Sequence, residues 1–295
     1  IVPVERISVA AGLATLEEGY ETKARQFIHA RGSDYVGGAE LLSPGRVITP
    51  LDIAVIASAG LADVAVSSNP AIRVLSTGDE LVAAGEPIAP HQVRSSNGPA
   101  IVAMLARHGF ADCLHDHLID DPEVLAERIA AHLEAADVLV LSGGVSMGKA
   151  DYVPGVLARL GVKVDFHKVS QRPGKPLWFG RAPGDKAVFA LPGNPVSALV
   201  CCRHYVIPSL GQACGVTAAA AEFAALTEDV TFAPALTCFQ PVRLLSNAIG
   251  QVLAMPVRTN TSGDFASLAG TDGYVELARE QSHFPSGSPV RLYRW

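Results

Sequence analysis

Three apolar segments, each followed directly by a glycine-containing turn, constrain the fold of this chain more than any other feature. The three turns cover residues 76–80, 142–148 and 191–195. A strand that ends in glycines exposes backbone N–H groups at its carboxyl end, and several such ends in one sheet form a crevice suited to an anion. We therefore expect a ligand site where these three turns meet.

The middle of the chain alternates between expected strands and expected helices. A helix can start at Asn97-Gly98-Pro99. Asp121-Pro122-Glu123 is a strong helix start, with a capping residue, proline at the first helical position and an acid near the helix dipole. Expected strands cover residues 72–76, 112–119, 137–141, 162–169 and 187–191, and further helices cover 152–160 and extend from 194 toward 211. This order predicts an α/β domain with a parallel-type sheet and helices on both faces.

The two flanks differ from this middle part. Before residue 71 we expect a β-rich and helical remnant, with strand-like pieces at 7–9 and 24–29 and a helix from Thr49-Pro50 to Gly60. After about residue 220, short apolar pieces at 225–232, 237–245, 252–258, 273–277 and 290–293 predict a small β barrel. The chain begins without Met inside a strand-like segment, and we expect an N-terminal truncation.

Composition narrows the class of protein. The chain of 295 residues is 49% hydrophobic with a net charge of -6, which argues against nucleic acid as a main partner. No apolar run approaches the length that spans a membrane. The five cysteines show no C-x-x-C spacing, which favours reduced thiols in a cytoplasmic protein over a zinc or redox site.

Acidic residues follow three of the expected strands. Glu80, Asp120 and Asp151 each stand at or just after a carboxyl end, and such ends share one edge of an open α/β sheet. A magnesium ion would relieve the repulsion between these carboxylates and bridge to phosphate oxygens. The alternatives are ordinary, because Asp121 is a helix cap, Asp151 could be one too, and Glu80 could be a solvated loop residue.

A basic segment follows another strand of the same expected sheet. Lys168, Arg172 and Lys175 surround the turn Pro173-Gly174, whose prolines prevent a helix that would separate the charges. The segment could hold an oxyanion or a phosphate, although charge runs are most often solvated surface.

Other candidates are weaker. Gly143, Gly148 and Lys149 fit a P-loop, but Ala150 stands where that loop needs Ser or Thr for magnesium. His115 and His117 would share one face of a strand, yet no third metal ligand is near in the sequence.

Taken together, these motifs resemble one family, the MoeA-type molybdopterin molybdotransferases, which include the corresponding domain of gephyrin. Five motifs carry the resemblance in the same order over residues 72–200: Ser76-Thr77-Gly78-Asp79-Glu80-Leu81, Asp120-Asp121-Pro122, Ser142-Gly143-Gly144-Val145-Ser146 with Asp151-Tyr152, Pro173-Gly174-Lys175-Pro176, and Leu191-Pro192-Gly193-Asn194-Pro195-Val196-Ser197. Arg31-Gly32-Ser33-Asp34 and Thr261-Ser262-Gly263 extend it more weakly.

The resemblance implies a division of the chain and a reaction. It places residues 1–40 in a β-rich domain, 41–70 in a helical connection, 71–217 in a molybdopterin-binding α/β domain and 222–295 in a β barrel. The family's reaction takes adenylylated molybdopterin and molybdate, cleaves the pyrophosphate link, releases AMP and inserts molybdenum at the dithiolene sulfurs, assisted by Mg²⁺. The rival hypothesis within the same fold is a molybdopterin carrier or an adenylyltransferase-like protein without insertase activity.

The resemblance also implies roles for individual residues and partners. The catalytic positions it implies are Glu80, Asp120, Asp151, Lys168, Lys175 and Asp34, with the first three as metal ligands. The substrate-binding positions it implies are Thr77, Gly78, Ser142, Gly143, Gly144, Ser146, Arg172, Pro192, Gly193, Asn194, Ser197, Arg243 and Ser262. Arg172 stands where the family more often has Lys. The resemblance further implies a homodimer and an adenylyltransferase partner that delivers the substrate.

Overall fold

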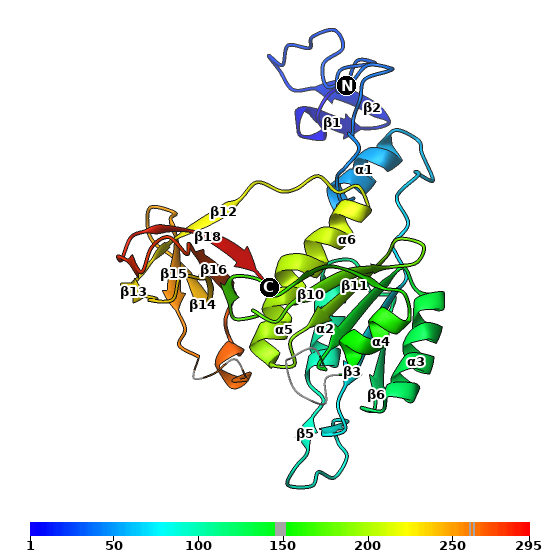
Figure 1. Cartoon of the computed structure of the whole chain (residues 1–295). Coiled ribbons are helices and arrows are strands. Elements are labelled where there is room, and N and C mark those ends of the chain that lie inside the picture. Colours follow the sequence, from blue (N-terminus) through cyan, green and yellow to red (C-terminus); the bar gives the residue numbers. More distant parts are fainter. Residues whose placement is uncertain (145–151, 260, 262) are drawn as a thin grey trace. The chain divides into compact units, whose positions relative to one another are not determined.

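A computed structural model describes residues 1–144, 152–259, 261 and 263–295 of the chain (Figure 1). The chain divides into two compact units, residues 1–64 and residues 65–295. The finer division expected at residues 40, 70 and 217–222 stays a prediction.

The first unit has little regular structure. A 3-10 turn η1 (Val4–Arg6) leads into an antiparallel pair, β1 (Ile7–Ala10) and β2 (Leu13–Leu16), and helix α1 (Pro50–Ser58) follows later. The expected helix start is confirmed, because Thr49 and Asp52 form a reciprocal capping box. The strand expected at 24–29 is wrong, since the segment forms turns in which Arg25 and Phe27 adopt left-handed backbone angles that no strand contains.

The second unit is built around a six-stranded sheet in the order β6-β3-β7-β11-β10-β8. The strands are β3 (Ile72–Thr77), β6 (Cys113–Leu118), β7 (Val138–Ser142), β8 (Lys163–His167), β10 (Trp178–Ala182) and β11 (Lys186–Leu191). The first four in the order pair in parallel, as expected. The sequence analysis missed β10, which pairs antiparallel with both neighbours, so β8 again runs in the common direction.

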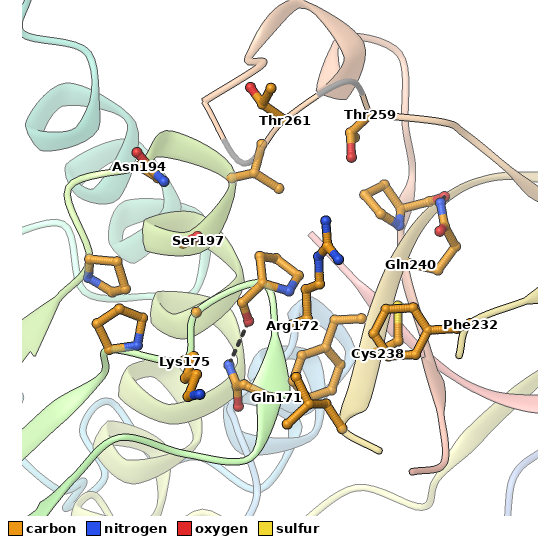
Figure 2. Close-up of a pocket in the computed structure, with 18 of the residues that line it drawn as sticks. Gln171, Arg172, Lys175, Asn194, Ser197, Phe232, Cys238, Gln240, Thr259 and Thr261 are labelled. Carbon is orange, nitrogen blue, oxygen red and sulfur yellow. Dashed lines mark hydrogen bonds between the residues drawn. The ribbon is translucent and has the colours of Figure 1, made fainter. Parts of the chain in front are cut away.

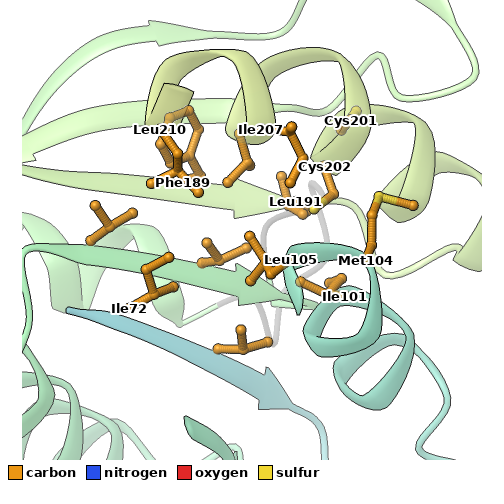
Figure 3. Close-up of a cluster of buried hydrophobic side chains, with 14 of the residues drawn as sticks. Ile72, Ile101, Met104, Leu105, Phe189, Leu191, Cys201, Cys202, Ile207 and Leu210 are labelled. Atoms are coloured by element: carbon orange, nitrogen blue, oxygen red, sulfur yellow. The ribbon is translucent and has the colours of Figure 1, made fainter. Parts of the chain in front are cut away.

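Helices cover both faces of this sheet, which confirms the expected α/β class. On one face lie α2 (Asn97–Arg107), α5 (Pro195–Cys201) and α6 (Ile207–Ala213), and on the other lie α3 (Pro122–Ala135) and α4 (Val153–Arg159). Alternate residues of β7 enter the two cores, Val140 on the first face and Leu139 and Leu141 on the second. Burial on both faces explains why this strand is apolar throughout, and Figure 3 shows the first core.

The helix expected from residue 194 toward 211 is present but is not uniform. Between α5 and α6 the backbone follows a π-helical turn, η2 (Cys202–Val206). Such turns interrupt α-helices most often next to functional sites.

A five-stranded barrel forms the C-terminal part of the second unit. Its strands are β12 (Glu222–Leu226), β14 (Thr237–Ser246), β15 (Val252–Pro256), β16 (Gly273–Leu277) and β18 (Pro289–Arg294). It closes because β15 pairs with both β12 and β14. The short strand β9 (Gln171–Arg172), from the basic segment, adds to β14, so this segment lies where the α/β part meets the barrel.

Short elements complete the fold. The pairs are β4 (Leu81–Val82) with β5 (Val93–Arg94), and β13 (Val230–Thr231) with β17 (His283–Phe284), and a 3-10 turn η3 covers Ala266–Leu268. The strand expected at 225–232 is therefore two strands, β12 and β13. Among the described residues, no helix has the length and apolar character needed to cross a membrane.

Candidate functional site

The ends of β3, β7 and β11 meet, as the three turns predicted. The Asn97 side chain at the start of α2 ties two of them together, because its Nδ2 donates to Ser142 Oγ at 2.9 Å and to the Gly193 carbonyl at 2.8 Å. The Gly143 amide donates to the Leu191 carbonyl at 3.3 Å.

Glycine is required at the end of β7. Gly143 has a φ of +100°, and a Cβ placed there would lie 2.6 Å from the Thr77 carbonyl oxygen. At Gly144 the corresponding Cβ would lie 2.8 Å from Thr77 Oγ1. Without side chains, the two turns can approach closely enough to present backbone and hydroxyl groups to one ligand.

A hollow of about 400 Å³, which we call the edge hollow, opens at this edge. Its lining includes predicted residues Thr77, Glu80, Ser142, Gly143, Gly193 and Asn194. Three buried oxygens of its lining residues have no hydrogen-bond partner in the described structure: Thr77 Oγ1, Ser95 Oγ and Asn97 Oδ1. A buried polar atom without a partner lowers the free energy of unfolding by about 1–3 kcal/mol. We therefore expect a bound ligand to supply the missing hydrogen-bond partners.

The predicted acids are not all at this hollow. Glu80 lines it, with its carboxylate beside Gly78. Asp120 lies at the neighbouring strand end, where its amide donates to Asp79 Oδ1 at 2.9 Å, but it does not line the hollow. Asp151 lies outside the described residues. In the part of the chain that the structure describes, no group of three His, Cys, Asp or Glu side chains is placed to hold a metal ion.

A second hollow, of about 580 Å³, lies between the basic segment, α5 and the barrel, and we call it the junction hollow (Figure 2). Predicted residues Arg172, Lys175, Pro192 and Ser197 line it, and Asn194 lines both hollows. Figure 2 shows the Arg172 side chain between the helix that carries Ser197 and the strand that carries Gln240.

The charge of the junction hollow is one-sided. Among the described residues, its lining contains three cations, Arg172, Lys175 and Arg258, and no carboxylate. Within the described part of the chain, none of these three side chains forms an ion pair or a hydrogen bond. The hollow therefore offers charged donors that are free to bind an anion.

Buried polar contacts hold the Pro173-Gly174 turn in place. Gln171 Nε2 donates to the Pro173 carbonyl at 3.0 Å, and the Tyr205 hydroxyl in the π-helical turn donates to Gln171 Oε1. Burial raises the pKa of Tyr205 to about 12, which keeps this donor protonated. The turn that carries Lys175 is thus fixed to the helix rather than free in solvent.

The other predicted residues lie elsewhere or cannot be placed at either hollow. Lys168 and Arg243 line neither, and Arg243 instead packs beside Gly270 on the barrel. Asp34 belongs to the first unit, whose position relative to the second is not determined. Gly78 and Gly144 belong to the turns at the edge hollow. Ser146 and Ser262 lie outside the described residues.

Sequence reasoning missed several lining residues of both hollows. Among the polar ones are Arg94, Ser95, Ser96 and Asn97 on the edge hollow, and Arg258 on the junction hollow. The polar run Ser95-Ser96-Asn97 at a helix start was the available signal. Nothing in the sequence around Arg258 distinguished it from a surface cation.

The histidine and cysteine alternatives lose their support. His115 Nε2 pairs with Ser76 Oγ at 2.9 Å and His117 Nε2 with the Gly78 carbonyl at 2.8 Å, so both rings make structural contacts. All five cysteines are free. Burial raises the pKa of the Cys202 thiol to about 12, which leaves it neutral and unreactive.

Comparison with known proteins identifies the family of this chain. Residues 73–212 match the family described as a probable molybdopterin binding domain, and residues 224–295 match the MoeA C-terminal region, domain IV. A molybdopterin molybdenumtransferase of Synechocystis sp. is 35% identical over 296 residues, which cover 100% of this chain and 73% of that protein. Another, of Synechococcus elongatus, is 35% identical over 91% of this chain and 66% of its own length.

A solved structure gives the same result. A molybdopterin biosynthesis MoeA protein from Pyrococcus horikosii matches 100% of this chain and 71% of its own, with a TM-score of 0.76 and 28% identity. The resemblance stated from the motifs is therefore confirmed over the whole length given. The chain belongs to the MoeA family, whose curated relatives here are molybdopterin molybdenumtransferases.

Proposed function

We propose that this protein inserts molybdenum into adenylylated molybdopterin with release of AMP, using the two adjacent hollows for the two substrates. The edge hollow takes the phosphate-bearing part of adenylylated molybdopterin, and the junction hollow takes molybdate. The carrier or adenylyltransferase alternative is less favoured, because a second hollow beside the barrel, with three cations among its described lining residues, has no evident use in a protein that only carries molybdopterin.

The observation that carries this proposal is the shared rim of the two hollows. Asn194 lines both, so ligands in the two hollows would approach each other at the amino-terminal end of α5. On one side of that rim are backbone groups and unpartnered hydroxyls, and on the other are unpaired cations. Holding two reactants in contact in this way is a large part of what an enzyme can contribute to a rate.

The junction hollow suits molybdate by its charge. Molybdate carries two negative charges on four oxygens, and Arg172 and Lys175 offer charge-assisted donors in a lining without a competing carboxylate. The planar guanidinium of Arg172 can hold two oxygens at once, so arginine at this position is compatible with oxyanion binding.

Magnesium enters the proposal through Glu80. This cation is commonly bound by one or two carboxylates together with substrate phosphates, and Glu80 faces the hollow proposed for the phosphates. Asp120 stands at the next strand end, and Asp151 is the third ligand that the motifs imply. Bound there, magnesium would neutralise charge on the pyrophosphate.

The test is AMP release from adenylylated molybdopterin in the presence of Mg²⁺, with and without molybdate. We expect molybdate-dependent release by the unmodified chain, and a loss of about 100-fold or more in Glu80→Gln, by analogy with the loss of one electrostatic group in other active sites. Glu86→Gln is the matched control, because Glu86 lies nearby in the sequence, between β4 and β5, carries the same charge and does not line the hollow.

The outcomes separate the alternatives. Binding of adenylylated molybdopterin without any AMP release in the presence of molybdate would identify a carrier and contradict the insertase proposal. Equal losses in Glu80→Gln and Glu86→Gln would show that only the net charge matters and would remove Glu80 from the site.

We also propose that the protein acts as a homodimer that receives its substrate from an adenylyltransferase partner in the cytoplasm. Exposed apolar side chains on α1 support the dimer, since Leu51 is 79% exposed and Ile53 is 56% exposed. Sedimentation at micromolar concentration tests it, and a monomer there would contradict the dimer proposal while leaving the proposed reaction intact.

A further inference from the structure

The junction hollow contains one cation that no motif pointed to. Arg258 follows β15 of the barrel, whereas Arg172 and Lys175 belong to the basic segment, so the three charges come from two separate parts of the second unit. Thr259, the next residue, is visible in Figure 2 on the far side of the space from Lys175. The barrel therefore contributes a third cation to the hollow that Arg172 and Lys175 also line.

We propose that Arg258 is a binding residue for the tetrahedral oxyanion, completing a three-cation cradle that selects doubly charged anions. This inference rests on the proposed function, because it assigns a further residue to the same oxyanion site. Two charges on the basic segment suffice to neutralise a dianion from one side. A third, from the barrel, gives the described lining of the hollow a net positive charge even when a dianion occupies it.

Three features of the hollow support this assignment. First, no Asp or Glu among the described lining residues would neutralise Arg258 instead of a ligand. Second, the Arg258 side chain has no hydrogen-bond or ion-pair partner among the residues that the structure describes, unlike Arg294, which binds Glu222 on the same barrel. An arginine left without a carboxylate beside a hollow is available for a ligand.

The third feature is a polar side chain on α5. Ser197 is only 4% exposed, it lines the hollow, and its hydroxyl has no hydrogen-bond partner within the described ranges. Its hydroxyl is therefore available to donate to an anion in the hollow. Because Ser197 is on α5 and Arg258 is on the barrel, an anion that contacts both would connect the two parts of the second unit.

The charge of the cradle has a consequence for selectivity. Each charge-assisted hydrogen bond contributes more to a dianion than to a monoanion of the same shape, because the Coulomb energy scales with the charge. Molybdate and sulfate are tetrahedral dianions, and perchlorate is a tetrahedral monoanion. Arg258 should therefore matter more for the first two than for perchlorate.

The experiment measures binding of molybdate, sulfate and perchlorate by isothermal titration calorimetry at fixed ionic strength. In Arg258→Gln we expect the dissociation constant for molybdate to rise about tenfold, which corresponds to the loss of one hydrogen bond to a charged group. The rise for perchlorate should be smaller, and Arg258→Lys should keep most of the affinity.

Arg279→Gln is the matched control. Arg279 is an exposed arginine near the barrel's rim that pairs with Glu280 and does not line the hollow. It removes the same charge from the protein at a residue that does not line the hollow. We expect its molybdate binding to match that of the unmodified chain.

The outcomes distinguish this inference from the proposed function. If Lys175→Gln weakens molybdate binding and Arg258→Gln does not, the oxyanion site stands and the role of Arg258 is refuted. If the unmodified chain binds none of the three anions, the oxyanion site itself is refuted. If Arg258→Gln and Arg279→Gln weaken binding equally, the effect is one of net charge and the cradle is refuted. Circular dichroism of each variant shows whether its fold is retained.

Discussion

At the scale of single residues, the site is defined by polar atoms that the fold buries and leaves without partners. Thr77 is 3% exposed, and its hydroxyl has no hydrogen-bond partner in the described structure. Such an atom lowers the stability of the ligand-free protein, and a ligand that binds it recovers the energy. Function and stability are therefore opposed at this position.

The substitution Thr77→Val tests that opposition. Valine has nearly the same shape without the hydroxyl, so we expect the free energy of unfolding without ligand to stay equal or to rise by about 1 kcal/mol. Binding of adenylylated molybdopterin should weaken by about tenfold. Urea denaturation and a binding titration measure the two effects, and Thr237→Val, at a half-buried threonine on β14 of the barrel, is the control. Unchanged binding in Thr77→Val would remove its hydroxyl from the site.

At the scale of elements, the helices begin where capping residues place them. Asp121 Oδ1 accepts hydrogen bonds from the Glu123 and Val124 amides at 2.9 Å, and Pro122 occupies the first helical position of α3. These interactions form between residues that are adjacent in the sequence, which is why the start of α3 was predictable. Because Asp120 directly precedes the cap residue Asp121, the same interactions fix the point at which the backbone of Asp120 joins the helix.

Removal of the cap should cost stability without affecting the site's chemistry. We expect Asp121→Ala to lower the free energy of unfolding by about 1 kcal/mol, because two amides of the first turn lose their acceptor. Glu127→Ala is the control, since Glu127 is an exposed residue in the middle of the same helix and caps nothing. Urea denaturation of both variants measures the difference, and equal stability of the two would show that water replaces the cap fully.

At the scale of the second unit as a whole, an aromatic cluster joins the π-helical turn to the barrel. The His204 ring lies 4.4 Å from the Phe239 ring and 4.8 Å from the Tyr293 ring, centroid to centroid. Its Nδ1 lies 3.2 Å from the Tyr274 hydroxyl. Burial lowers the pKa of His204 from 6.5 to about 4. The Glu276 carboxylate opposes this lowering of the pKa, and the positive charges of Arg291 and Arg203 add to it.

This lowered pKa predicts how stability depends on pH. Between pH 6.5 and about 4 the unfolded chain binds a proton at His204 and the folded chain does not. Stability is therefore fully present above pH 6.5 and falls as the pH drops through this window, by at most about 3 kcal/mol. His204→Gln should remove that part of the slope in urea denaturation, and His91→Gln, at an exposed histidine, should keep it. A slope that is the same in all three proteins would contradict this role of His204.

The sequence by itself determined the alternation of elements, most helix starts and the turns of the edge hollow, because these depend on neighbouring residues. Apolar runs such as Val138–Leu141 identify buried strands, and Gly143-Gly144 identifies a turn that no side chain can enter. The same short motifs carried the resemblance to the MoeA family, since groups that bind phosphate through the backbone must be adjacent in sequence.

Only the tertiary structure decided how the predicted residues divide between two hollows. Thr77 and Glu80 belong to one, Arg172 and Lys175 to the other, and only the path of the basic segment into the barrel sheet separates them. Arg258 was beyond sequence reasoning, because it lines the same hollow as residues about 80 positions earlier in the chain. Backbone turns are local and can be read from neighbouring residues, whereas a cavity depends on side chains that meet only after distant segments have packed.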